Sequence, residues 1–281
     1  MSRRWQHVRH QLRRNRPAQF SLLVLFIFIV AALCAGLSPY DPDRMSLGAR
    51  TLPPDAAHWF GTDEYGRDYF TRALYGGQIS LMVGFLAMLF STLIGTVVGT
   101  VSGYFGGWLD NLMMRAVDIL MAIPAFFLLL VVNAYLKPGV DNIILIISLL
   151  TWMSMSRLVR AETLTVKERE YVLYARASGE HPLRIILRHI LPGVMPTVIV
   201  AATLNIASAI LMESTLSFLG LGVQAPAASW GSMLNNAQSY IGEASWLAMF
   251  PGILILLTVF SFNVLGDVFR TAFEPGANCD E

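Results

Sequence analysis

Residues whose types and spacing could perform chemistry are few in this sequence. Its only lysines, Lys137 and Lys167, do not follow a glycine, so neither completes the Gly-Lys-Ser/Thr ending of a phosphate-binding loop. The five histidines lack zinc-protease spacing. Gly220-Leu221-Gly222 lacks the further glycine of a dinucleotide-binding turn. The sequence therefore predicts a chain that is not an enzyme and binds no cofactor or metal.

The surrounding elements are predominantly apolar. Hydrophobic residues make up 55% of the 281 residues and charged residues only 14%, whereas a soluble domain carries about 25% charged residues. A membrane-spanning helix needs about 20 mostly apolar residues, and six runs approach or exceed this length: 20–37, 79–103, 116–136, 143–158, 193–219 and 246–269. These runs predict an all-α membrane protein with six transmembrane helices.

Basic residues divide unevenly between the segments that these runs separate. If all six runs cross the membrane, 15 of the 20 Lys and Arg residues fall on one side, in the N-terminal tail, between residues 157 and 188, and at Arg115 and Arg270. Short cytoplasmic segments carry an excess of Lys and Arg. We therefore expect both termini of this multi-pass protein to be cytoplasmic.

The first run follows basic residues, as the apolar part of a cleaved signal peptide does. Its length of about 18 residues exceeds the usual ~7–15, and Leu33 beside Cys34 does not fit a lipoprotein site. We expect a retained anchor. The predicted organisation therefore begins with a basic cytoplasmic tail (1–19), followed by an anchor helix with an external loop (20–78). A transmembrane core (79–270), which contains a cytoplasmic loop at 159–192, and a cytoplasmic tail (271–281) complete it.

The cytoplasmic loop shows the most regular helical pattern. Thr165 and Glu168 fit a capping box, which predicts a helix from there to Ser178 with Gly179 as its stop. Pro182 suits the first turn of a second helix, whose apolar residues recur at helical spacing: Leu183, Ile186, Leu187, Ile190 and Leu191.

This second helix is amphipathic, and Pro192 and Pro196 are expected to bound the return of the chain into the membrane. Such a helix lies on acidic lipid headgroups in some proteins and docks into a groove of a partner in others. The pattern alone favours neither interpretation.

The same loop contains two tetrapeptides, Arg169-Glu170-Tyr171-Val172 and His189-Ile190-Leu191-Pro192. With Ala175 and Gly179 they resemble the conserved cytoplasmic loop of the binding-protein-dependent ABC importers, in the form found in peptide and nickel permeases. Leu173 and Tyr174 depart from the general pattern, which has Glu and Ala there. Residues 58–68, 217–223, 229–231 and 262–267 are similar to further segments of the second permease subunit of dipeptide, oligopeptide and nickel systems.

The resemblance implies a type I ABC importer permease core over 79–270 that forms half of a translocation pathway for di- or oligopeptides. Nickel or another metal chelate is the alternative substrate. A self-sufficient secondary transporter is disfavoured, because neither membrane-midplane charges nor inverted repeats are visible.

The resemblance also implies partners, which are a non-identical permease, two cytoplasmic ATPase subunits that use ATP and Mg, an external substrate-binding protein and membrane lipid, but no nucleic acid. It implies that the following residues couple the chain to the ATPases: Glu170, Ala175, Gly179, Leu183, Ile186, Leu187, Ile190, Leu191 and Pro192.

Ionisable and small residues within the predicted spans allow further predictions. Asp118 is expected to pair with Arg115 and Asp267 with Arg270, each at a membrane boundary. Glu213 either lines the pathway or caps an unwound end of the fifth span. Three glycines spaced by four residues, Gly95, Gly99 and Gly103, are expected to permit close helix packing within the chain. Pro124 is expected to kink the third span.

Overall fold

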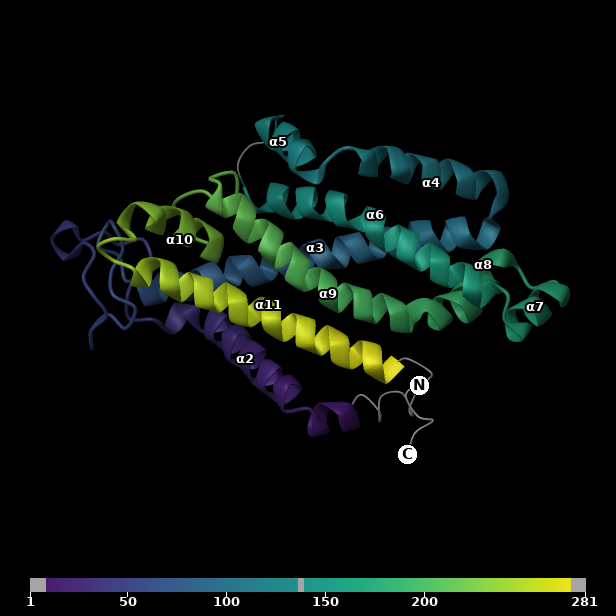
Figure 1. The fold of residues 1–281 in the computed structure, drawn as a ribbon, viewed down its shortest axis with the longest axis horizontal. Helices are drawn as coiled ribbons and strands as arrows, with labels where there is room; N and C mark the ends of the chain where they lie inside the picture. The colour runs from purple at the N-terminus through teal and green to yellow at the C-terminus, as the bar shows by residue number, and fades with distance from the viewer. Residues whose placement is uncertain (1–8, 136–138, 274–281) are drawn as a thin grey trace.

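The computed structural model describes residues 9–135 and 139–273, and these residues are almost entirely helical (Figure 1). No strand occurs in these two ranges, where only an isolated bridge joins Thr62 and Asp68. The long helices are α2 (Arg16–Leu33), α3 (Tyr69–Phe105), α4 (Gly107–Ala122), α5 (Ala125–Tyr135), α6 (Val140–Lys167), α9 (Leu191–Phe218) and α11 (Trp246–Phe273). The shorter ones are η1 (Ala35–Leu37), η2 (Leu47–Ala49), α7 (Glu170–Ala177), α8 (Pro182–Ile185), η3 (Ile186–Ile190), α10 (Trp230–Ala237) and η4 (Gln238–Tyr240).

Five continuous helices in the described ranges are long and apolar enough to cross a membrane. They are α2, α3, α6, α11 and the helix that runs from Pro182 to Phe218 through α8, η3 and α9. These five correspond to five of the six predicted runs, and most are longer than predicted. The prediction of six crossings therefore depends on the third run.

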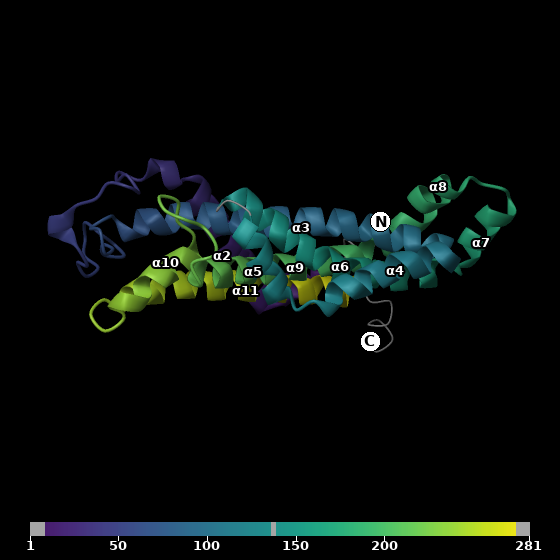
Figure 2. The same ribbon diagram turned by 90° about the horizontal axis from the view of Figure 1, so that it is seen from above.

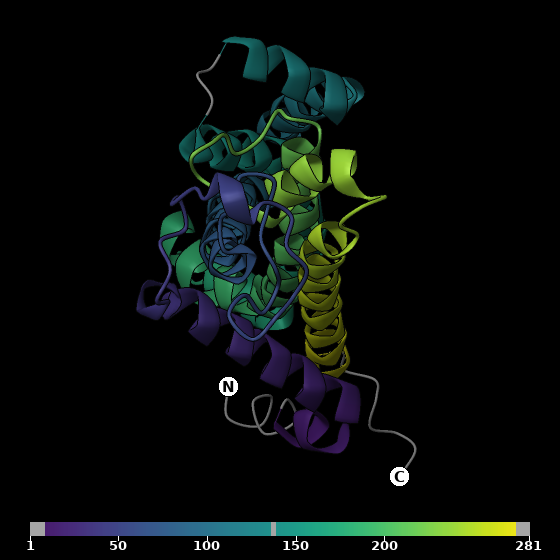
Figure 3. The same cartoon turned by 90° about the vertical axis from the view of Figure 1, so that its left-hand side faces the viewer.

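The third predicted run, 116–136, is not one helix. α4 ends at Ala122 and α5 begins at Ala125, with Ile123 extended at φ −82° and ψ 122°. A residue before proline is pushed out of the helical region by the proline ring, so Pro124 ends the helix, and the prediction of a simple kink was wrong. α4 and α5 lie on one flank of the bundle and α2 on the opposite flank (Figure 3).

Three glycines of α3, Gly95, Gly99 and Gly103, pack closely against α6. An added Cβ at Gly95 would lie 2.6 Å from the Cβ of Met155, and one at Gly103 would lie 2.8 Å from the Cβ of Thr163. At Gly99 the obstacle is the backbone carbonyl of Ser156. This confirms the prediction that the glycine repeat serves packing within the chain.

The two ends of the bundle carry different structures (Figures 1 and 2). One end holds α7 and α8, and the other holds residues 38–68 together with α10. α2 begins and α11 ends towards the α7 end. Of the predicted cytoplasmic tails 1–19 and 271–281, residues 1–8 and 274–281 lie outside the described residues. The side of the membrane on which both tails lie stays a prediction.

Candidate functional site

The first helix of the predicted coupling loop begins later than its sequence indicates. α6 continues through Thr165, whose hydroxyl donates to the Ala161 carbonyl at 3.4 Å inside the helix. Glu168 is the C-cap of α6, so the capping-box prediction was wrong. Continuing α6 keeps Val166 buried and lets Lys167 donate to the Gly103 carbonyl at 3.0 Å.

The turn after α7 matches its prediction. Gly179 has φ +76°, which L side chains rarely adopt. Its N–H donates to the Arg176 carbonyl, and the N–H of Glu180 donates to the Ala175 carbonyl, both at 3.1 Å. This pair of bonds is a Schellman motif. An added Cβ at Gly179 would meet nothing within 4 Å, so the requirement for glycine here is conformational rather than steric.

The second helix starts at Pro182, as predicted, but then widens. His181 caps it by accepting from the Leu183 N–H at 3.3 Å. Residues Ile186–Ile190 form a π turn, in which the Leu191 N–H donates to the Ile186 carbonyl, five residues back. α9 follows without a break.

Pro192 therefore lies in the first turn of α9, and Pro196 lies inside it. The prediction that these prolines bound the return of the chain was wrong. A proline ring in a regular α-helix clashes with the carbonyl four residues earlier. The wider π turn places Pro192 where the hydrogen-bond pattern has already shifted by one residue, which lets the helix continue.

The π turn divides the predicted apolar face into two sets. Ile186 and Ile190 are 8% and 0% exposed and point into the protein, whereas Leu183 and Leu187 are 58% and 56% exposed. The two members of each pair are four residues apart, and the two pairs lie in different surroundings instead of forming one face. The contiguous face Leu183, Ile186, Leu187, Ile190 and Leu191 is therefore incorrect, although all five residues lie in one helix. Leu191 is intermediate in burial.

The buried set joins the loop to the membrane helices. Ile186 and Ile190 belong to one apolar cluster with α7, α6 and α9, and the other members of this cluster are Met155, Val159, Val166, Val172, Ala175, Ile185, Val194 and Val198. Of the predicted coupling residues, Ala175 is buried in it, while Glu170 and Pro192 are exposed. Sequence reasoning missed Val172 and Ile185, which are 0% and 1% exposed. Their apolar type gave a signal, but the predicted helical register placed Ile185 off the apolar face.

The exposed set contains more apolar surface than predicted. Tyr174 is 76% exposed and Leu173 is 43% exposed on α7. We call Leu173, Tyr174, Leu183 and Leu187 the exposed apolar set. Glu180 holds the turn between the two helices, accepting from His189 at 3.1 Å and lying 3.9 Å from Arg184.

Glu213 lies at the opposite end of α9 and is 0% exposed. Its carboxylate accepts from Ser80 of α3 at 3.1 Å and from Ser217 of α9 at 2.7 Å. The Ser80 hydroxyl in turn accepts from the backbone N–H of Trp230 in α10 at 3.2 Å. α9 remains helical as far as Phe218, so the unwound-end alternative was wrong. Glu213 joins three helices, and its place in a pathway stays a prediction.

The predicted pair of Asp118 and Arg115 was also wrong. Asp118 of α4 pairs with Arg157 of α6. Three residues after Arg157 on α6, Arg160 donates two hydrogen bonds to Asp110, at 2.5 and 2.6 Å. Because α4 lies along α6 (Figure 1), acidic side chains of α4 reach arginines of the neighbouring helix, and these pairs fasten α4 to the bundle.

Comparison with known proteins identifies the family. The family described as "Binding-protein-dependent transport system inner membrane component" matches residues 95–278. The family described as "N-terminal TM domain of oligopeptide transport permease C" matches residues 3–54. Both matches agree with the helices and loops described above.

Individual relatives match over nearly the whole chain. The dipeptide transport system permease protein DppC of Bacillus subtilis (strain 168) is 43% identical over 94% of this chain and 83% of the relative. The oligopeptide transport system permease protein OppC of the same organism is 38% identical over 96% and 89%. The glutathione transport system permease protein GsiD of Shigella flexneri serotype 5b (strain 8401) is 41% identical over 96% and 90%. With five long apolar helices among its described residues, this chain is a multi-pass inner membrane protein that belongs to the family of binding-protein-dependent transport system inner membrane components.

Proposed function

We propose that this chain is one of two non-identical permease subunits of a peptide importer. Separate ATPase subunits would hydrolyse ATP, and an external binding protein would deliver the substrate. The chain is similar to permeases named for dipeptide, oligopeptide and glutathione transport, and glutathione is itself a tripeptide. These relatives support peptides over nickel as the substrate class.

The observation that carries the proposal is the division of side chains in the loop. Leu183 and Leu187 extend outwards, whereas Ile185, Ile186 and Ile190 of the same segment are buried. Protruding leucines at i and i+4 suit insertion into a groove of a partner protein. Full burial of a leucine contributes about 1.5–3 kcal/mol, and these two are already partly buried. Docking would therefore gain about 1 kcal/mol from each.

The same arrangement explains how motion would pass into the membrane. The helix from Pro182 to Phe218 is continuous, so displacement of Leu183 or Leu187 moves α9 directly. Ile190 and Val172 are fully buried in the cluster shared with α6 and α7. Closure of the ATPase subunits would thus rock α6 and α9 together and switch the pathway between inward-facing and outward-facing states.

Co-purification with the ATPase subunits tests the docking half of the proposal. Leu187→Asp should lower recovery of the ATPase with the permeases by about tenfold, since 1.4 kcal/mol corresponds to a factor of ten, and Leu183→Asp should act similarly. Leu47→Asp is a matched control, because Leu47 is 71% exposed near the opposite end. Full recovery of the ATPase with Leu187→Asp would instead make the loop a lipid-surface element.

Uptake tests the substrate half. A strain lacking its own peptide importers, supplied with this chain, its partner permease, the ATPases and the binding protein, should accumulate labelled dipeptide in an ATP-dependent manner. Labelled nickel is the control substrate. Uptake of nickel without dipeptide, or dipeptide transport by the purified chain alone, would contradict the proposal.

A further inference from the structure

The break between α4 and α5 leaves backbone carbonyls without hydrogen bonds on one flank of the bundle. α4 ends at Ala122, and α5 begins at Ala125. No described residue donates a hydrogen bond to the carbonyls of Met121, Ala122 and Ile123. All five residues from 121 to 125 are exposed. The free carbonyls are therefore open to whatever surrounds this flank.

The break lies within the predicted hydrocarbon region. Asp118 pairs with Arg157 of α6, close to the end of the predicted apolar run 143–158. Ile123 is five residues further along α4, which corresponds to about 7.5 Å at 1.5 Å per residue. From Arg157 back to Ile143, α6 stays within its apolar run for about 21 Å by the same rise. Figures 1 and 2 agree that the break is level with the middle of the bundle rather than with either end.

Lipid alone cannot surround such a break. The hydrocarbon core offers no donor to a free carbonyl, and each unsatisfied group there costs several kcal/mol. Irregular backbone at this depth occurs only where protein covers it or where it lines a water-filled cavity. The surroundings of the break are therefore either a dry protein contact or water.

Exposed polar side chains beside the break favour water. We call the following residues the polar face: Asn111, Arg115 and Asp118 of α4 with Ser154 and Arg157 of α6. The three α4 residues recur at helical spacing on the face that also contains Ala122, and all five are exposed. Charged side chains in a membrane protein face either the interior of the bundle or a water-filled cavity. Because Asp118 and Arg157 are 47% and 49% exposed as side chains, they do not lie in the interior.

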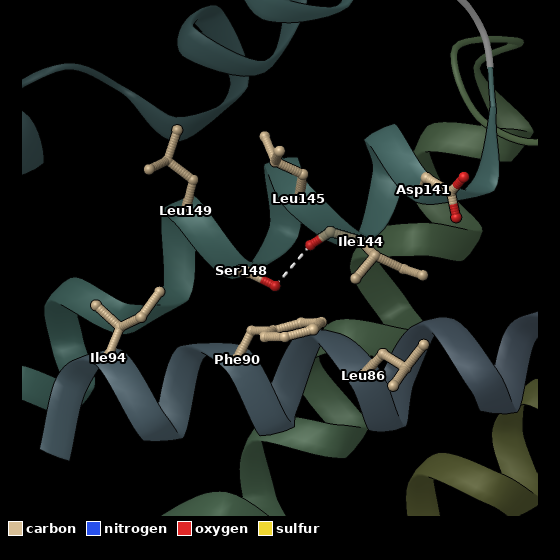
Figure 4. A pocket seen from close by; sticks show the side chains of 8 residues that line it. All are labelled: Leu86, Phe90, Ile94, Asp141, Ile144, Leu145, Ser148 and Leu149. Atoms are coloured by element: carbon tan, nitrogen blue, oxygen red, sulfur yellow. Dashed lines mark hydrogen bonds between the residues drawn. The ribbon is translucent and has the colours of Figure 1, made fainter.

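Another side of α6 shows an apolar surface for comparison. There Leu149 and Phe90 of α3 line an apolar groove, and the Ser148 hydroxyl donates to the Ile144 carbonyl of its own helix at 2.6 Å (Figure 4). Leu149 and Ser154 are five residues apart, so they project about 140° apart around a helix of 3.6 residues per turn. The polar face and the apolar groove are therefore separate surfaces, and only the polar face adjoins the exposed pair of Asp118 and Arg157.

We propose that the break and the polar face line a water-filled passage, in which the free carbonyls accept hydrogen bonds from N–H groups of the cargo. These carbonyls stand at the C-terminal end of α4, where the helix dipole adds partial negative charge. They therefore suit an ammonium group or an amide N–H, and a peptide carries both. The nature of the cargo rests on the proposed function, whereas the presence of water at the break does not.

Cysteine accessibility in the complete importer tests for water at the break. Single cysteines are introduced into a Cys34→Ser, Cys279→Ser background, and the complex in lipid vesicles receives a methanethiosulfonate with a quaternary ammonium group on both sides of the membrane. Ala122→Cys and Ser154→Cys should both react, and Ser154→Cys still tests the passage if the Ala122 variant does not assemble.

Two control positions define a slow reaction. Phe26 is 66% exposed on α2, which lies on the opposite flank (Figure 3), and Val117 of α4 is 1% exposed. Phe26→Cys and Val117→Cys should react at least about tenfold more slowly than Ala122→Cys, a difference of about 1.4 kcal/mol in activation free energy. The reason is that neither lipid nor a packed protein contact admits a charged reagent.

Added cargo tests the carbonyl contacts. During ATP-driven transport, a dipeptide delivered by the binding protein should slow the reaction of Ala122→Cys, because the cargo occupies the break. The reaction of Phe26→Cys should not change.

Three results would decide against parts of this account. Reaction of Ala122→Cys and Ser154→Cys as slow as that of Phe26→Cys would show that the partner permease covers the polar face, and would overturn the passage. Fast reaction of Ala122→Cys that a transported dipeptide leaves unchanged would overturn the carbonyl contacts. Fast reaction in a complex that transports no peptide would contradict the proposed function and leave the passage standing.

Discussion

The two ends of the bundle place polar and apolar side chains in opposite ways. At the end that carries residues 38–68, charged side chains are buried: Asp63 is 1% and Arg67 is 4% exposed. At the end that carries α7 and α8, Leu183 and Leu187 are more than half exposed. Buried, fully paired charges fix one geometry, whereas exposed apolar side chains are available for contact with the partner that we propose.

The fixed end is held by ion pairs and caps. Arg67 donates to Asp63 at 2.6 Å, and Asp63 also lies 3.6 Å from Arg72. Asp68 caps α3 by accepting from the Thr71 N–H at 2.7 Å and contacts His58 at 2.8 Å. Burial raises the pKa of the neighbouring Glu64 carboxyl. This network ties the external loop to the start of α3.

The comparison predicts that the largest loss of stability follows from breaking this network. Arg67→Ala should destabilise the folded chain by about 3–5 kcal/mol, because it removes the nearer of the two arginines that pair with the buried Asp63 carboxylate. Thermal unfolding in detergent and the amount recovered from membranes would measure the loss. Arg44→Ala is the control, because Arg44 is exposed in the same loop. Equal stability of the two variants would mean that the external end is not fixed by its charges.

A smaller loss is expected where Glu213 joins α3, α9 and α10. Glu213→Ala should destabilise the chain by about 1–3 kcal/mol, because it leaves the buried Ser80 and Ser217 hydroxyls without their acceptor. The stability of the folded chain and its peptide uptake should fall together. Unchanged stability with abolished uptake would contradict this structural role and would favour the pathway interpretation instead.

Gly179→Ala tests the end that we propose to move. The substituted residue must adopt φ +76°, which costs about 1–2 kcal/mol. The cost can be avoided if the turn re-aims α8, so ATPase recovery and uptake should fall while the folded membrane core persists. Gly48→Ala is a suitable control, because an added Cβ there meets nothing within 4 Å and its φ is not positive. Normal uptake by Gly179→Ala would show that the direction of α8 is not critical.

The smallest effect is expected at the flank between the two ends. Arg157 and Asp118 are 49% and 47% exposed as side chains, and exposed ion pairs contribute about 0–1 kcal/mol. Arg157→Ala should therefore lower the free energy of unfolding by less than Arg160→Ala does. The Arg160 variant removes a bidentate pair to the Asp110 side chain, which is 10% exposed. The reverse order would show that α4 is held mainly near its C-terminal end.

The sequence alone determined the features that depend on neighbouring residues along the chain. Long apolar runs predicted the helices around 20–37, 79–103, 143–158, 193–219 and 246–269, because hydropathy is a local average that lipid selects directly. Gly179 and Pro182 marked a stop and a start, since their backbone preferences act within one turn. The tetrapeptides beginning at Arg169 and His189 identified the family.

Only the tertiary structure decided which side chains of these helices meet. The partner of Asp118 is 39 residues away on another helix, and Arg67 is buried by the fold of a loop whose composition reads as exposed. Ile185, Ile186 and Ile190 are buried in a cluster with residues of α6 and α7, whereas Leu183 and Leu187 are exposed. Such choices depend on packing between distant segments, and no local pattern carries that information.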